Sequence, residues 1–127
     1  MDPQEELKGF YDLVVEKCPQ GLDGYETNFP VRIGNNDLHA VIFGLPNGMS
    51  MEFALFPNID ANDPRARYMR KKLTINAAGK IIRRENNTNL APEFKTDNEP
   101  NFDGITDEEV ALAVARAVKQ AFQNQAA

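Results

Sequence analysis

The stretch Leu38–Phe56, LHAVIFGLPNGMSMEFALF, decides the fold of this chain because it is the most apolar run in the sequence. We expect it to form one β-hairpin that turns at Leu45-Pro46-Asn47-Gly48-Met49. Pro46 presets φ at the first corner, and Gly48 accepts the left-handed conformation that closes a three-residue loop. The register that follows pairs four positions across the hairpin: Leu45 with Met49, Phe43 with Met51, Val41 with Phe53, and His39 with Leu55.

This register gives the hairpin two apolar faces. The expected core side includes Phe43, Met51 and Phe53. The side chains that would point the other way are Leu38, Ala40, Ile42, Ala54 and Phe56. A sheet with apolar residues on both faces needs two covers. Helices can provide one cover, and the other would come from the chain itself, a dimer partner or a ligand.

Two helices are predicted at the ends of the chain. Residues 2–18 begin with Asp2 as N-cap and Pro3 at the first helical position. The expected buried stripe of this helix is Leu7, Phe10, Tyr11, Val14 and Cys18. The second helix covers 106–124, where Thr106 and Glu109 have the spacing of a capping box.

Shorter elements fill the middle of the chain. Residues 29–33 alternate as a strand, and Pro30 within them favours an edge position. Asp63 and Pro64 suit the start of a short helix that extends to about Lys71, and an irregular connection is the alternative. Residues 72–76 and 80–85 are predicted to form a second hairpin that turns through Gly79.

We therefore expect an α+β fold with a single antiparallel sheet of about five strands and helices at both ends packed on it. The 127 residues fit one domain, and residues 86–104 form a long, irregular, acidic loop within it. The expected element order resembles that of bacterial type III secretion chaperones, which are dimeric effector-binding proteins. The resemblance concerns layout only and implies a binding module, and it assigns no functional residue. It depends on the short helix, and the 86–104 loop departs from it.

The composition narrows the class of protein. A net charge of −5 argues against a general nucleic-acid binder, so nucleic acid is not an expected partner. No apolar run has the length of a membrane span, and the first residues lack the pattern of a secretory signal. The single cysteine suits a reducing compartment. We therefore expect a cytoplasmic protein with no membrane contact.

Positive charge is concentrated in one segment, which we call the basic block. It holds eight of the fourteen Lys and Arg residues and no acid, so fourteen minus eight leaves six bases beside nineteen acids elsewhere. Its members are Arg65, Arg67, Arg70, Lys71, Lys72, Lys80, Arg83 and Arg84. Such a block can dock an acidic protein, a phosphate or a nucleic acid. It can equally protect a sheet edge or be neutralised by the acidic loop that follows.

Catalytic candidates are poor. His39 is the only histidine and lies within a predicted strand, and Cys18 lies on a helix stripe, so they do not form a recognisable nucleophile pair. There is no phosphate loop or metal-spaced ligand set, and we predict no catalytic residue, metal or cofactor. The leading hypothesis is a non-enzymatic protein-binding module: an adaptor, secretion-type chaperone or inhibitor/immunity protein. Homodimerisation is a further hypothesis. The alternatives are a small-ligand or anion-binding domain that uses the 65–84 segment, and a small enzyme of unknown class.

Overall fold

The computed structural model describes residues 2–17, 29–44, 50–60, 62–86, 102 and 104–125. Five strands form one antiparallel sheet in sequence order, β1-β2-β3-β4-β5. In chain order, the elements are α1 (Pro3–Lys17), β1 (Phe29–Ile33), β2 (Asn36–Gly44), β3 (Ser50–Pro57), the 3₁₀ helix η1 (Pro64–Arg67), β4 (Lys71–Asn76), β5 (Ile81–Asn86) and α2 (Asp107–Gln125). The predicted α+β fold with a five-stranded antiparallel sheet and terminal helices is confirmed.

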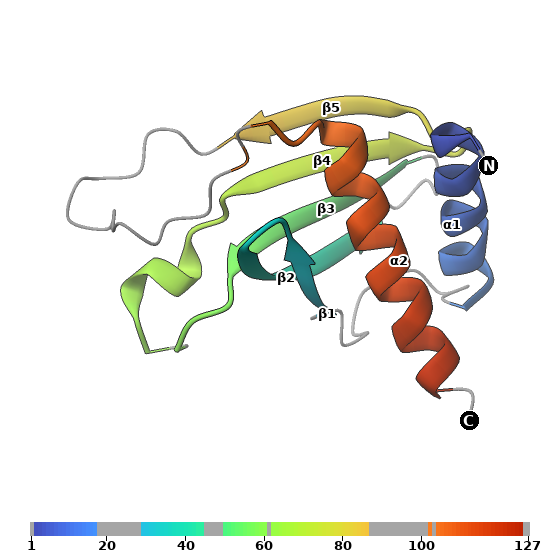
Figure 1. Ribbon diagram of the computed structural model, residues 1–127. Coiled ribbons are helices and arrows are strands. Elements are labelled where there is room, and N and C mark those ends of the chain that lie inside the picture. Colours follow the sequence, from blue (N-terminus) through green and yellow to red (C-terminus); the bar gives the residue numbers. More distant parts are fainter. Residues whose placement is uncertain are drawn as a thin grey trace.

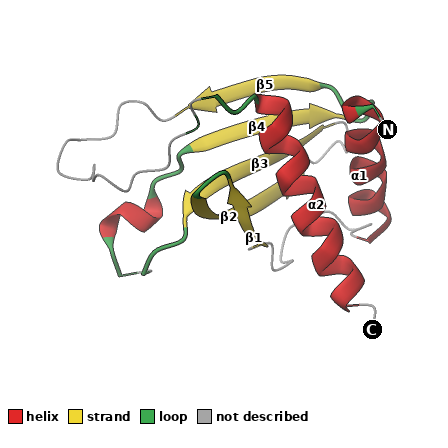
Figure 2. Ribbon diagram, viewed as in Figure 1, coloured by secondary structure: helices red, strands yellow, loops and turns green. Residues whose placement is uncertain are grey.

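Both helices lie on the same side of the sheet, and α2 crosses the strands obliquely (Figures 1 and 2). Their starts follow the predicted capping chemistry. The backbone N–H of Gln4 donates to Asp2 Oδ1 at 2.9 Å, and the backbone N–H of Glu109 donates to Thr106 Oγ1 at 3.1 Å. These bonds satisfy amide groups that lack a partner within the helix, so each helix begins where its cap residue stands.

The core lies between the two helices and the sheet. Phe53 is 1% exposed, and its ring meets that of Phe10 with centroids 5.6 Å apart. The α1 stripe is buried as predicted at Leu7, Phe10, Tyr11 and Val14, whereas Cys18 lies outside the described residues. From α2 the buried side chains are Val110, Ala111, Val114, Ala115, Val118 and Phe122. One sheet face is therefore fully occupied by helices.

The predicted register of the central hairpin was wrong by one residue. Ile42 pairs with Phe53, and Phe43 pairs with Glu52. Met51 and Phe53 are buried as expected, but Phe43 is 46% exposed on the opposite face. The inward residues of β2 are Leu38, Ala40 and Ile42, which had been assigned to the second face.

The physical reason lies in the polar content of each alternating set. The observed register turns the wholly apolar sets of both strands toward the helices, with Leu38, Ala40 and Ile42 from β2. The predicted register would instead have buried His39, and burying a polar group costs free energy unless it is hydrogen-bonded. The burial of apolar side chains, and not the turn chemistry expected at residues 45–49, therefore explains the observed register. Residues 45–49 themselves lie outside the described residues.

The smaller predictions had mixed outcomes. β1 is an edge strand, as Pro30 indicated, and Gly79 has a positive φ of 81° in the β4–β5 turn. The helix expected from Pro64 to about Lys71 is only the 3₁₀ turn η1. It stops early because the backbone N–H of Arg70 donates to the carbonyl of Leu55 at 2.7 Å, which returns the chain to the sheet. Most of the 86–104 loop lies outside the described residues.

Candidate functional site

The sheet face opposite the helices is the candidate site, and we call it the open face. Its residues follow from the register, because cross-strand partners project to the same side of a sheet. No described helix lies on this side (Figure 2). It carries His39, Val41 and Phe43 from β2, Ser50, Glu52, Ala54 and Phe56 from β3, Lys72, Thr74 and Asn76 from β4, and Arg83 and Glu85 from β5.

The β2–β3 half of the open face carries aromatic and aliphatic side chains together with the polar Ser50 and Glu52. Val41 pairs with Ala54. Phe43 is the next β2 residue on this face, and it is 46% exposed. His39 and Phe56 stack with ring centroids 5.5 Å apart and an interplanar angle of 15°. Burial lowers the pKa of His39 from its ordinary value, which favours the neutral imidazole in this stack. An aromatic and aliphatic surface of this kind is suited to a partner that excludes water.

The β4–β5 half of the open face is charged. Lys72 Nζ lies 3.1 Å from Glu85 Oε2, and Arg83 Nη2 lies 3.4 Å from Glu85 Oε1. The hydrogen bond from Lys72, with the charges of Lys72 and Arg83, lowers the pKa of Glu85 despite some desolvation. Glu85 is therefore ionised at neutral pH, and it holds two cations of the basic block in place.

Thr74 marks the boundary between the two halves. It pairs with Glu52 on one side and Arg83 on the other, and it is only 4% exposed. Its Oγ1 atom has no hydrogen-bond partner among the described residues. A buried hydroxyl without a partner costs free energy, so this atom locally destabilises the strand.

The structure does not gather the basic block into one patch. Arg65, Arg67 and Arg70 lie in or beside η1, whereas Lys80 lies beside the distant β4–β5 turn. Lys72 and Arg83 are on the open face, but Lys71 and Arg84 project to the helix side, toward α2. Strand alternation separates neighbours in sequence onto opposite faces, which composition alone does not reveal.

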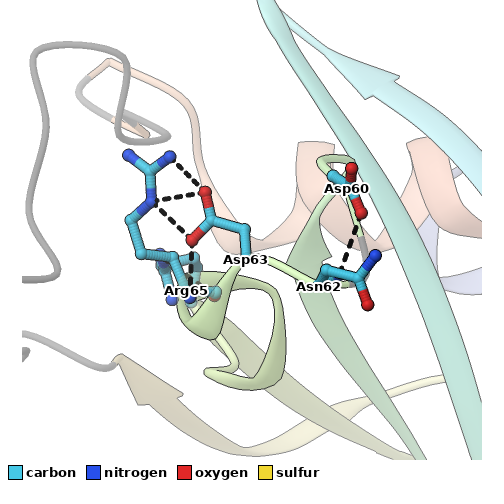
Figure 3. A network of polar contacts seen from close by, with 5 residues as sticks. Asp60, Asn62, Asp63 and Arg65 are labelled. Atoms are coloured by element: carbon cyan, nitrogen blue, oxygen red, sulfur yellow. Dashed lines mark hydrogen bonds and ion pairs between the residues drawn. The ribbon is translucent and has the colours of Figure 1, made fainter.

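Five of the eight residues form ion pairs with partners among the described residues: Arg65, Lys71, Lys72, Arg83 and Arg84. Figure 3 shows the Asp63 carboxylate against the Arg65 guanidinium, with Arg65 Nε 2.9 Å from Asp63 Oδ1. The side-chain and backbone hydrogen bonds of Arg65 lower the pKa of Asp63 to about 2. Arg70 is 7% exposed and donates to the carbonyl of Tyr68. These contacts give much of the block a structural role.

Lys71 is the most deeply buried member. Its side chain is 6% exposed, and its ammonium group lies 2.6 Å from Asp107 Oδ1 and 2.8 Å from Asn86 Oδ1. The ammonium nitrogen also lies 5.7 Å from the ring centroid of Phe102. The residues that neutralise the described part of the block are thus Asp63, Glu85 and Asp107, which the sequence analysis had not singled out.

A second feature lies on the helix side, away from the open face. A groove of about 390 Å³ runs between α1 and α2. It is lined by Glu5, Glu6, Gly9, Phe10, Asp12, Leu13, Glu16, Ala115, Arg116 and Lys119. Sequence reasoning missed it because a groove between two helices depends on how they pack.

The parts of the chain that the structure describes hold no cluster of metal-ligating side chains. No three His, Cys, Asp or Glu side chains there are grouped to hold a metal ion. No helix in the described ranges combines the length and hydropathy needed to cross a membrane.

Comparisons with known proteins found no matching family model, no similar curated protein and no similar solved structure. The class that the fold defines is therefore an α+β domain with a five-stranded antiparallel sheet whose helices cover one face. The resemblance of layout to secretion chaperones has no support from these comparisons.

Proposed function

We propose that this chain is a non-enzymatic protein-binding module that engages its partner through the open face. The observation that carries the proposal is Phe43, a large aromatic residue near the end of β2 that is 46% exposed on the sheet face opposite the helices. Aromatic residues surrounded by polar groups are typical anchors of protein interfaces. Adaptor, secretion-type chaperone and inhibitor/immunity protein are the roles that fit such a surface.

Glu52 lies opposite Phe43, and the cations of the open face lie on β4 and β5, where they suit a polypeptide partner with acidic groups. Arg83 is 68% exposed at its side chain and keeps only a 3.4 Å contact with Glu85. A partner carboxylate can therefore compete for this guanidinium. A second copy of the chain is one such partner, since the chain is acidic overall. A cytoplasmic location belongs to the same proposal.

The anion-binding alternative has less support than the protein-binding one. It requires the 65–84 bases to converge on one ligand, whereas five of them already pair with Asp63, Glu85 or Asp107. An anion would have to displace carboxylates that are covalently part of the same chain. The enzyme alternative has no specific observation in its favour, and no group of His, Cys, Asp or Glu among the described residues could hold a catalytic metal ion.

Site-specific photo-crosslinking tests the proposal. A benzophenone amino acid replaces Phe43 in one variant and Val15 in a matched control, because Val15 is similarly exposed, at 49%, but lies on α1. The expected result is a protein adduct from position 43 that is absent from position 15. An adduct with a second copy of this chain would identify a homodimer. Equal labelling from both positions, or none from position 43, would contradict the proposal.

A second measurement examines the contribution of charge. With a captured partner in hand, Arg83→Gln should slow association and reduce its salt dependence, with little change in melting temperature. Surface substitutions of this type usually change stability by no more than about 0.5 kcal/mol. A partner that binds wild type and variant equally, without salt dependence, would show that Arg83 is a solvated edge residue.

A further inference from the structure

We infer that the groove between α1 and α2 is a separate docking site for a cationic amphipathic helix of a partner protein. The groove extends along α1 from Glu5 to Glu16, and at about 1.5 Å per residue this distance is about 16 Å. Its length matches about three turns of a helix. This inference concerns the helix side of the molecule and does not rest on the open face.

The groove combines an apolar floor with charged walls. Phe10, Leu13 and Ala115 contribute its apolar surface. Helix-in-groove recognition uses such a floor to receive apolar side chains spaced one turn apart. A guest helix of this kind carries leucine-like residues along one stripe.

The charges on the groove walls indicate which charge the flank of the bound helix carries. Asp12 is paired with Lys8 at 2.8 Å, and Glu6 with Arg116 at 2.8 Å. Glu5 and Glu16 have no ion-pair partner within the described residues, and Lys119 lies on the opposite wall. Two uncommitted carboxylates about three turns apart on one wall attract lysine or arginine side chains at a matching spacing.

Gly9 provides the space above the floor. A Cβ atom built at Gly9 would have no neighbour within 4 Å, although the residue lies in the middle of α1. Glycine is less favourable than alanine in the middle of a helix. The missing side chain leaves room for a guest residue between Glu5 and Glu16.

The probe for this site is a synthetic alanine-based helical peptide of about 15 residues, long enough to form a partial helix in water. It carries leucines on one stripe and lysines on one flank. The control peptide has the same sequence with glutamates in place of the lysines. Binding is followed by fluorescence anisotropy. We expect the lysine peptide to bind at least tenfold more tightly than the control peptide. Its binding should weaken as the salt concentration rises from about 0.05 M to about 0.5 M. Equal binding of the two peptides would overturn the inference.

Substitutions inside and outside the groove test where the lysine peptide binds. Gly9→Trp places a bulky side chain in the groove from a position where a Cβ atom meets no neighbour within 4 Å, and it should weaken binding of the lysine peptide by more than about tenfold. The matched Val15→Trp, at an exposed position on the same helix, should bind the peptide as wild type does. Glu5→Gln with Glu16→Gln should weaken binding by about fivefold and reduce its salt dependence. Phe43→Ser separates the two sites. Peptide binding lost in Phe43→Ser but kept in Gly9→Trp would place the peptide on the open face and overturn the inference.

Discussion

Lys71 on β4 and Asp107 at the start of α2 form an ion pair of 2.6 Å, with the lysine side chain 6% exposed. Asp107 Oδ2 also accepts a hydrogen bond from Arg84 Nη1 on β5 at 2.8 Å. One carboxylate therefore joins the first turn of α2 to two adjacent strands. Its negative charge also lies at the positive end of the helix dipole, which stabilises it further.

Removing this carboxylate should destabilise the fold. Asp107→Asn leaves the buried ammonium of Lys71 without its counter-ion, and losing one partner of a buried pair costs about 3 kcal/mol or more. Lys71→Met should cost less, because Asp107 keeps Arg84 and an apolar chain of similar length replaces the lysine. Denaturant unfolding measures both changes in the free energy of unfolding. A change below about 0.5 kcal/mol in Asp107→Asn would contradict the structural role of the pair.

The same pair predicts the pH dependence of stability. Burial raises the pKa of Asp107, but the hydrogen bonds from Arg84 and Lys71, with their charges, outweigh it and lower the pKa overall. A carboxyl whose pKa is lowered on folding contributes stability above its unfolded pKa of about 3.9, and this contribution is lost as pH falls through the folded pKa. The gap in unfolding free energy between wild type and Asp107→Asn should therefore narrow below about pH 4. A gap that stays constant through the acid range would contradict the pKa direction.

Two phenylalanines on opposite faces of the hairpin form a matched test of the register. Phe53→Ala should cost about 3–5 kcal/mol because the ring is 1% exposed against α1. Phe43→Ala should cost less than about 1 kcal/mol because the ring is 46% exposed. Thermal or denaturant unfolding compares the two. Similar losses at both positions would support the rejected register with Phe43 in the core.

Three glycines should respond differently to alanine. A Cβ at Gly79, where φ is 81°, would collide with backbone atoms of Gln4 and Lys8, so Gly79→Ala should move α1 and destabilise by more than about 1 kcal/mol. Gly104→Ala meets no neighbour but is strained by its φ of 78°, and should cost about 1 kcal/mol. Gly9→Ala should stabilise by about 0.5–1 kcal/mol, since it is helical and unobstructed.

The melting temperatures of the three alanine variants measure the order of their stabilities. The expected order is Gly9→Ala above wild type, then Gly104→Ala, then Gly79→Ala. Gly79→Ala with the melting temperature of wild type would show that the β4–β5 turn does not press against α1.

The sequence by itself determined the elements whose signals are local. The helices at both ends could be predicted because Asp2 and Thr106 accept hydrogen bonds within the first turn of their own helices. The strands and the positive φ at Gly79 followed from alternation and turn chemistry within a few residues. These features depend on neighbours in the chain, so composition and spacing were enough.

Only the tertiary structure decided which face of each strand is buried and which charges meet. The hairpin register depended on the choice between apolar sets when both strands packed against the helices, and this choice moved Phe43 from the core to the open face. The basic block was divided because alternate residues of β4 and β5 point to opposite sides, where Glu85 and Asp107 pair with them. These outcomes depend on contacts between segments far apart in sequence, so local patterns do not contain them.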